Sequence, residues 1–398
     1  MNGWVDGSNG ISHTPCHVTP THASNLPSIH SSNLPFFHSS NPLIFGPAYL
    51  DVVLTLDRLL LAGGPTLDQS LPAARLTPRD DGVLEVVGPT GDRLVFVLPP
   101  DQAEFAATCE LCEPVLARTR PGRVVTGEYG VSSAVRQLGG MGAGYAKALG
   151  GLLRMPVGDD AVGCEVLQLL AQHEIDAVPA VLPDCPSDTS LLLQSPQGDK
   201  LAIGVRRAMT RWQAIPEDHA LAAQASALVF CGALNALMAA VLEQAPDIPV
   251  MCAPALRNVC DRDVPLASLA TKIDYLTLNA LEWAQLDGAA EMRRQVPVIT
   301  VTEGAQGSRV LLGEREIHIP AVPFTGPADT NRAGETYAAT FFRDLLAACP
   351  EFPRGMTADA AEHAGRLAAM QAAKQLAMRE FGIPSLEEKS FHAKAQRD

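Results

Sequence analysis

Asp329-Thr330-Asn331-Arg332-Ala333-Gly334-Glu335-Thr336-Tyr337 is a polar, glycine-containing stretch that runs directly into the small and apolar residues 338–346. Such a run is typical of a helix packed closely on a sheet. The first N–H groups of a helix have no partner within it and attract anions such as phosphate. The stretch therefore predicts either a phosphate-binding helix start or a tight turn that binds nothing.

Upstream of this loop, short apolar runs alternate with segments of helical spacing. The runs fall at 43–45, 51–54, 152–157, 227–230, 249–252, 275–278 and 298–301, and helical patterns cover 143–153 and 164–173. Strands that alternate with helices predict a mostly parallel sheet with helices on both faces, and ligands at the carboxyl ends of the strands.

Two hairpin patterns interrupt this alternation. Residues 82–87 and 93–97 flank a Gly-Pro-Thr-Gly-Asp turn, and residues 189–194 and 200–205 flank a turn at Gly198. Both predict antiparallel pairs. We expect the insertions at about 67–135 and 187–208 to form a small β sheet that acts as a lid, as a homodimer interface, or as both.

Composition excludes several classes of protein. With 398 residues and 47% hydrophobic content, the chain can bury a large core in one or two domains. A net charge of −14 argues against a nucleic-acid-binding surface. Nine cysteines, an odd number, are typical of reduced and buried thiols, and the lone Cys109/Cys112 pair suits a surface helix better than a zinc or redox site.

The two ends of the sequence differ from its middle in composition and in the structure that they predict. Residues 1–42 are rich in Ser, Asn, His and Pro, which predicts a disordered segment. A folded domain is expected over 43–390 and a short tail over 391–398. No secretory signal pattern and no apolar run long enough to span a bilayer is present in the sequence, so we expect a soluble, cytoplasmic protein with no membrane partner.

From about Ile44 to Ile383 the chain resembles the ribokinase-like sugar kinases of the PfkB family. The motifs that carry this resemblance occur in order: Gly46 to Asp51, Gly139-Gly140 with Gly144-Tyr145-Ala146, Val157 to Gly163, Asn279-Ala280-Leu281-Glu282, Thr302 to Gly307, and the loop described first. The resemblance implies a three-layer α/β/α fold with a small β lid, ATP and Mg²⁺ as cofactors, and a small-molecule substrate.

On the nucleotide side, two motifs each have two interpretations. Asn279 and Glu282 lie one helical turn apart, where Glu282 could organise Mg²⁺ beside ATP phosphates or the pair could simply cap a helix. Thr302, Gly304 and Gly307 match the family's nucleotide-binding turn, although glycines in an ordinary hairpin would look the same.

On the acceptor side, the resemblance assigns substrate binding to Asp51, Gly139, Gly140 and Arg257. Asp51 follows the first apolar run, which favours a ligand-facing acid over a solvent-facing loop acid. Gly144 stands where these kinases usually carry Asn, and Ala253-Pro254-Ala255-Leu256-Arg257 keeps only the Arg of Asp-x-Asn-x-Arg. Ribose, fructose or adenosine in the usual pose would lack hydrogen-bonding partners.

The loop at 329–335 aligns with the family's Asp-Thr-x-Gly-Ala-Gly-Asp. Glu335 takes the place of the aspartate that accepts the acceptor's proton, and Arg332 replaces the first glycine, while Ala333 and Gly334 keep the amides that hold the transferring phosphate. Arg332 could clamp that phosphate, fill the anion hole, or pair with Glu335 and hold it away from the substrate.

The sequence and the resemblance predict two alternative functions. The first is an ATP- and Mg²⁺-dependent phosphotransferase with Glu335 as the general base. The second is a kinase-like nucleotide-binding or regulatory protein that has lost turnover.

Overall fold

The computed structural model describes residues 41–58, 127–194, 200–324 and 332–376, together with strands at 61–62, 75–79, 83–87, 93–97, 114–118 and 123–124. All of these belong to one compact unit, Ser39–Asp398. The predictions for the disordered segment before residue 41, for Cys109 and Cys112, and for the C-terminal tail lie outside the described residues.

A nine-stranded sheet forms the centre of this unit. Its strands run in the order β11 (Ala177–Leu182), β10 (Leu152–Gly158), β1 (Leu43–Phe45), β14 (Leu228–Cys231), β15 (Val250–Ala253), β16 (Tyr275–Asn279), β17 (Val298–Thr302), β18 (Ser308–Leu312) and β19 (Arg315–Ile319). The strands pair in parallel from β11 to β17, and β18 and β19 continue the sheet antiparallel. The mostly parallel sheet predicted from the apolar runs is confirmed.

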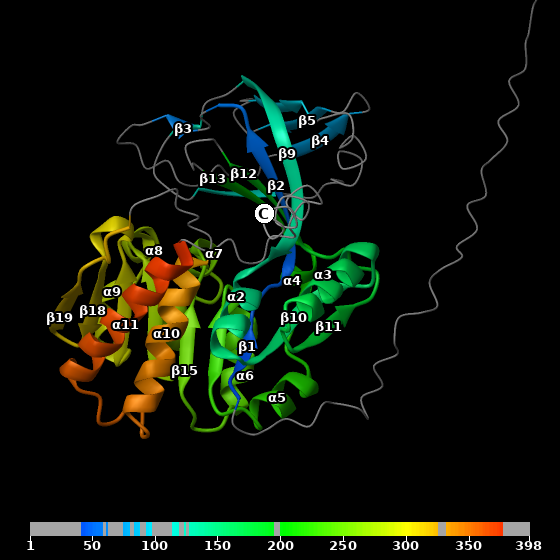
Figure 1. Cartoon of the computed structure of the whole chain (residues 1–398). Helices are drawn as coiled ribbons and strands as arrows, with labels where there is room; N and C mark the ends of the chain where they lie inside the picture. The colour runs from blue at the N-terminus through cyan, green and yellow to red at the C-terminus, as the bar shows by residue number, and fades with distance from the viewer. Residues whose placement is uncertain are drawn as a thin grey trace, which may run out of the picture. The chain divides into compact units, whose positions relative to one another are not determined.

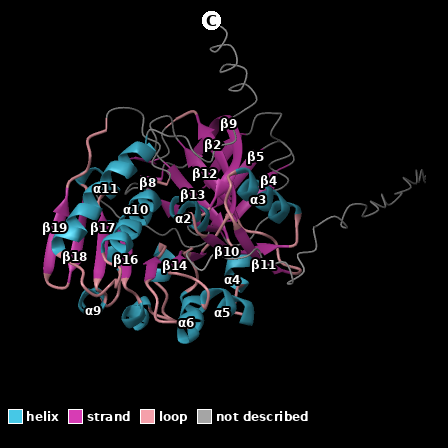
Figure 2. Cartoon of the chain, turned by 60° about the horizontal axis from the view of Figure 1, so that its bottom comes forward, coloured by secondary structure: helices cyan, strands magenta, loops and turns pink. Residues whose placement is uncertain are grey.

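Helices cover both faces of this sheet, as predicted, with α2, α10 and α11 on one face and α5, α6 and α9 on the other (Figures 1 and 2). The described helices are α2 (Met141–Leu149), α3 (Ala161–Gln172), α4 (Ala208–Arg211), α5 (Pro216–Ala222), α6 (Asn235–Gln244), α7 (Leu256–Val259), α8 (Ala280–Gln285), α9 (Ala289–Gln295), α10 (Ala333–Ala348) and α11 (Ala358–Leu376), with 3₁₀ turns η3 (Leu266–Lys272) and η4 (Gly304–Gln306).

The main core lies between the sheet and α10. Helix α10 presents Phe341 and Phe342, and both rings stack on Tyr275 of β16, with centroids 5.1 and 5.8 Å apart. Small residues at Ala338 and Ala339 let the helix approach the strands closely, and both are fully buried. The apolar run after the loop at 329–337 therefore has the role that its composition predicts.

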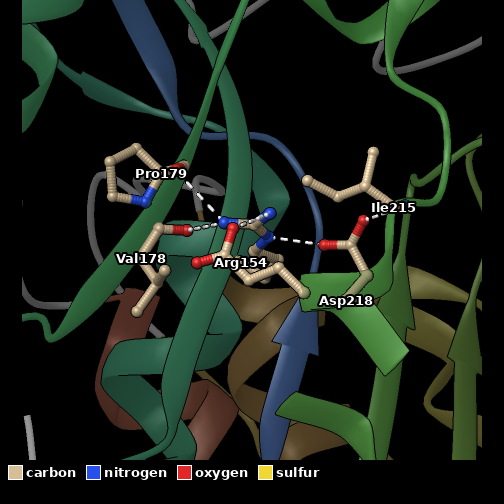
Figure 3. Close-up of polar contacts among 6 residues, drawn as sticks. Arg154, Val178, Pro179, Ile215 and Asp218 are labelled. Atoms are coloured by element: carbon tan, nitrogen blue, oxygen red, sulfur yellow. Dashed lines mark hydrogen bonds and ion pairs between the residues drawn. The ribbon is translucent and has the colours of Figure 1, made fainter. Parts of the chain in front are cut away.

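A buried ion pair fixes the other face (Figure 3). Arg154 of β10 donates from Nε to Asp218 Oδ1 of α5 at 2.6 Å, and from Nη1 to the carbonyl oxygens of Val178 and Pro179 in β11. The second Asp218 oxygen accepts from the N–H of Ile215 at 2.9 Å. Because every charged partner is hydrogen-bonded, this site holds α5 against β10 and β11.

The predicted small sheet is larger than expected. The eight-stranded sheet runs β4 (Arg75–Arg79), β5 (Val83–Val87), β6 (Arg93–Val97), β9 (Gly127–Gly139), β2 (Tyr49–Leu56), β12 (Thr189–Gln194), β13 (Lys200–Val205) and β7 (Pro114–Arg118), beside a separate pair, β3 (Leu61–Ala62) with β8 (Arg123–Val124). Both predicted hairpins are confirmed as antiparallel pairs. We call this the lid sheet, and β2 and β9 join the two hairpins within it (Figure 1).

Two structural expectations are tested over the described residues. The six cysteines among them, Cys164, Cys185, Cys231, Cys252, Cys260 and Cys349, are free thiols, as predicted. Within the same residues, no helix combines the length and the apolar character needed to cross a bilayer.

Candidate active site

The candidate active site lies where the strand order of the central sheet reverses. From β1 the chain proceeds to β10 and β11 on one side, and then returns to β14 and β15 on the other. In open α/β sheets, ligands bind outside the carboxyl ends of the strands at such a switch point. Here these ends bring together the segments at Gly46 and Gly232, and α2 and α10 pack beside them.

Helix α10 begins at the predicted catalytic loop. Arg332 is its N-cap residue and has a φ of 66°, in the left-handed region that favours glycine. This backbone conformation explains why glycine suits the position and implies a strain of about 1 kcal/mol for arginine. Glu335 lies in the first helical turn, where a carboxylate is favoured, with 20% of its side chain exposed.

The Arg332 side chain crosses from α10 to the end of β9. Nη1 donates to the carbonyl oxygen of Gly140 at 2.5 Å, and Nη2 donates to that of Leu138 at 3.2 Å. Nη1 also lies 3.6 Å from Glu335 Oε1. Of the three roles considered for Arg332, this geometry matches the pairing with Glu335, and it adds a link to β9.

Gly144 makes room for this arginine. A Cβ added at Gly144 would lie 3.2 Å from Arg332 Nη1, 3.3 Å from Arg332 Cδ and 3.4 Å from Glu335 Cγ. A larger side chain there requires Arg332 to move. The two departures from the family pattern, at Gly144 and Arg332, are therefore one structural feature.

Asp51 lies within β2 of the lid sheet, not in a loop that leaves the central sheet. It pairs with Gln137 of β9 and with Ser190 of β12. The chain leaves β1 at Phe45 and enters this second sheet at Tyr49.

The Asp51 carboxylate is buried against Gly139, where an added Cβ would lie 2.3 Å from Asp51 Cγ. Gly139 is needed here for close approach. Burial raises the pKa of Asp51 from 3.8 to about 6; the positive charges of Arg332 and Arg206 and a hydrogen bond from Ser190 oppose this shift, while the negative charge of Glu335 adds to it. Asp51, Arg332 and Glu335 thus form one electrostatic cluster, and Gly140 joins it through its carbonyl oxygen.

Arg257 lies at the carboxyl edge of the central sheet, in α7 after β15. Its Nη2 donates to the carbonyl oxygen of Gly232, which follows β14. Burial, and to a smaller degree the positive charge of Arg206, lower the pKa of Arg257 to about 10. Tyr49 and Asp188 oppose this shift, so both lie near Arg257.

On the nucleotide side, Asn279 and Glu282 form a capping box at the start of α8. Asn279 Oδ1 accepts from the N–H groups of Leu281 and Glu282 at 3.0 and 2.9 Å, and Glu282 Oε2 accepts from the N–H of Asn279 at 2.9 Å. The capping interpretation is confirmed. Burial raises the pKa of Glu282 to about 7; the hydrogen bonds of Asn279 oppose this shift and the charge of Glu335 adds to it.

Thr302, Gly304 and Gly307 form the turn between β17 and β18. Thr302 Oγ1 donates to the carbonyl oxygen of Leu278 at 3.4 Å. Gly307 has a φ of 98°, and an added Cβ would lie 2.1 Å from the carbonyl oxygen of Ile319, so only glycine fits. At Gly304 and Gly334, an added Cβ would meet none of the described atoms within 4 Å, so both backbones face open space.

These residues fit a nucleotide with bound Mg²⁺. Among the described residues, no group of three or more His, Cys, Asp or Glu side chains could hold a metal ion. Magnesium in proteins usually binds one or two carboxylates and otherwise phosphates and water, so a single acid such as Glu282 is compatible with Mg²⁺ that arrives with a nucleotide.

Sequence reasoning missed three residues of this cluster. Arg206 follows β13 and lies over the ring of Tyr49, with its Cζ 4.0 Å from the ring centroid, and Asp188 precedes β12. Their positions in the sequence could have indicated them, because polar residues that flank predicted strands lie at an edge of the sheet. Nothing in the sequence indicated which edge faces Arg332 and Glu335.

Comparisons with known proteins identify the family and the fold. A family model described as pfkB family carbohydrate kinase matches residues 125–384. A search of curated proteins found no match.

Solved structures share the fold. A ribokinase from Giardia lamblia is 15% identical, with a TM-score of 0.60, over 86% of this chain and 94% of the other. An adenosine kinase from Sinorhizobium meliloti is 18% identical, with a TM-score of 0.57, over 89% and 99%. A ribokinase from Arabidopsis thaliana, solved with ribose and ATP, is 17% identical, with a TM-score of 0.56, over 85% and 93%. These likenesses establish a ribokinase-like fold.

Proposed function

Since the chain belongs to the pfkB family of carbohydrate kinases, we propose that it transfers the γ-phosphate of ATP to a hydroxyl group of a sugar-like or nucleoside-like small molecule. The observation that carries this proposal is the position of Glu335. Its carboxylate lies in the first turn of α10, within the same electrostatic cluster as Asp51. The candidate base therefore comes from helix α10, and the candidate acceptor-binding acid comes from the lid sheet.

Each residue has a chemical task in this proposal. Asp51 accepts a hydrogen bond from an acceptor hydroxyl, and Glu335 removes the proton from the hydroxyl that attacks. The N–H groups of Ala333 and Gly334, unpaired within the helix, hold the transferring phosphoryl oxygens. Arg332 binds the Glu335 carboxylate and ties it to β9, so it is a positioning residue.

The remaining motifs that match the family would hold the nucleotide. The turn at Thr302, Gly304 and Gly307 approaches ATP through its backbone, and Glu282 and Asn279 lie beside the phosphates. When bound, Mg²⁺ supplies charge neutralisation at the phosphates. Two glycines shape the acceptor side. Gly139 leaves room for the Asp51 carboxylate, and the carbonyl oxygen of Gly140 accepts a hydrogen bond from Arg332.

A nucleotide-binding protein without turnover is the second candidate. The contact between Arg332 and Glu335 favours this candidate if it holds the carboxylate away from the substrate hydroxyl. In that case ATP binds and no acceptor is phosphorylated.

Calorimetric titration with ATP and Mg²⁺, paired with an ADP-release assay over sugars and nucleosides, separates the two candidates. We expect ADP release with at least one acceptor, and we expect Glu335→Gln to reduce kcat by about 10² to 10⁴ while ATP affinity stays within about threefold. Glu362→Gln, on the exposed side of α11, is the matched control and should retain full activity. Undiminished turnover in Glu335→Gln would show that another group is the base.

A further inference from the structure

Two arginines of the candidate site lie near each other, and neither forms an ion pair with a described carboxylate. Arg206 comes from the end of β13 in the lid sheet, and Arg257 comes from α7 at the edge of the central sheet. A Cβ added at Gly232 would lie 3.7 Å from Arg257 Nη2 and 3.8 Å from Pro47 Cδ, and Arg206 packs on the ring of Tyr49, two residues after Pro47, so both guanidinium groups lie at the same entry to β2. Throughout the described part of the chain, neither guanidinium has a carboxylate within ion-pair distance.

Only part of the donor capacity of each guanidinium is used. Arg206 donates from Nη1 to the carbonyl oxygens of Thr189 and Val205, at 2.6 and 3.3 Å, and packs on the ring of Tyr49. Arg257 donates from Nη2 to Gly232, and its Nε is buried with no acceptor among the described residues. A guanidinium has five N–H donors, so several remain available on both side chains.

Keeping two such cations together is unfavourable unless an anion joins them. Removing a charged group from water costs free energy unless it is paired. Contacts with backbone carbonyls and with the face of Tyr49 fix the orientation of both side chains but do not neutralise them. The arrangement is therefore preorganised for a ligand that brings negative charge.

The acids nearby do not serve as that partner. Asp188 Oδ1 accepts from the N–H groups of Arg207 and Met209 at 2.6 and 3.4 Å, which fixes its carboxylate on the backbone of α4. Asp51 is held against Gly139 and hydrogen-bonded to Ser190. Both lie close enough to interact with the arginines electrostatically, yet neither makes an ion pair with Arg206 or Arg257.

We propose that the acceptor carries an oxyanion group, a phosphate monoester or a carboxylate, which docks on Arg206 and Arg257 while one of its hydroxyl groups lies between Asp51 and Glu335. The inference rests on the proposed function, since it names the chemical class of the acceptor. It also accounts for the missing hydroxyl-binding side chains at Gly144 and Ala253 to Ala255, because charge replaces them as the source of affinity.

Matched acceptors test this proposal directly. Ribose, ribose 5-phosphate and ribonate form one set, and fructose, fructose 6-phosphate and 2-ketogluconate form a second. For wild type, kcat/KM and calorimetric affinity should favour an anionic member at least tenfold over its neutral counterpart. The phosphate and carboxylate arms identify which oxyanion the site takes.

The arginine variants provide the structural control. Arg257→Gln and Arg206→Gln should each weaken affinity for the preferred anion about 30-fold or more, and they should weaken affinity for the neutral sugar at least tenfold less than that. Arg257→Lys keeps the charge but loses the planar fork, so it should retain an intermediate affinity. Arg366→Gln on exposed α11 should change nothing.

The outcomes separate this inference from the proposed function. Anion binding that depends on Arg257 but never yields ADP supports the anion site and overturns the kinase proposal. Turnover of neutral sugars that equals or exceeds turnover of the anions overturns the anion site and leaves the kinase proposal standing. The anion site is also overturned if none of the six compounds binds, or if both arginine variants lose neutral and anionic binding equally.

Discussion

At the scale of single residues, the structure joins two substitutions that are far apart in sequence. Arg332 occupies space that exists only because residue 144 is glycine, and from there it reaches Leu138, Gly140 and Glu335. The residue types at both positions were readable from the sequence. Their contact was not, because it depends on how α2 packs against α10.

Gly144→Asn should therefore destabilise the protein by about 1–3 kcal/mol, because the new side chain displaces Arg332. In an Arg332→Gly background the same change should cost little, which gives a coupling of at least about 1 kcal/mol in a double-mutant cycle measured by urea unfolding. Additive effects would mean that the two positions do not share this space.

Asp51, the proposed acceptor-binding acid, also affects stability. In the folded protein the Asp51 carboxyl group keeps its proton up to about pH 6, whereas in the unfolded chain it loses that proton near pH 3.8. The folded state therefore binds more protons in this window, and Asp51 lowers stability as pH rises through it, by up to about 3 kcal/mol. The charges that act on it are Arg332, Arg206 and Glu335.

Asp51→Asn should accordingly be more stable than wild type at pH 7.5, and the difference should shrink toward pH 4. Urea unfolding at both pH values measures this, with the exposed Asp263→Asn as the control that should show no such trend. A stability gain that grows toward acid would contradict the assignment. Binding of the acceptor should be lost in the same variant.

At the scale of elements, most of the central sheet was predictable. Its strands are short, mostly apolar runs such as 228–231 and 298–301, because both faces are buried beneath helices. Strands β2 and β9 were not predicted as sheet partners. β9 is 13 residues long and mixes polar and apolar positions, and its pairing with β2 spans some 80 residues of chain that no local pattern reveals.

The buried ion pair of β10 and α5 gives the prediction at this scale (Figure 3). Arg154 and Asp218 are both 0% exposed, whereas Glu217, the second acid on Arg154, is 37% exposed. Asp218→Asn should cost about 3–5 kcal/mol because it leaves a buried cation with too little charge compensation, and Glu217→Gln should cost less than about 1 kcal/mol. Equal losses in thermal unfolding would show that burial does not set the energetics here.

At the scale of the whole molecule, the order of the sequence motifs predicted the fold and the family. The candidate active site, in contrast, forms where the central sheet and the lid sheet meet. Glu335 and Arg257 lie on helices α10 and α7 beside the central sheet. Asp51 and Tyr49 lie in the lid sheet, and Arg206 directly follows its strand β13. That division explains why the sequence indicated the candidate catalytic loop but not Arg206 and Tyr49. The lid sheet's further role, as a cover or a homodimer interface, remains a prediction.

The central claim is phosphoryl transfer with Glu335 as base, and ³¹P NMR of a reaction with ATP, Mg²⁺ and each matched acceptor tests it most directly. We predict that the γ-phosphorus signal of ATP is replaced by ADP and by a new phosphate ester of an anionic acceptor. In Glu335→Gln this signal should not develop. ATP that is bound yet stays intact with every acceptor would contradict the account.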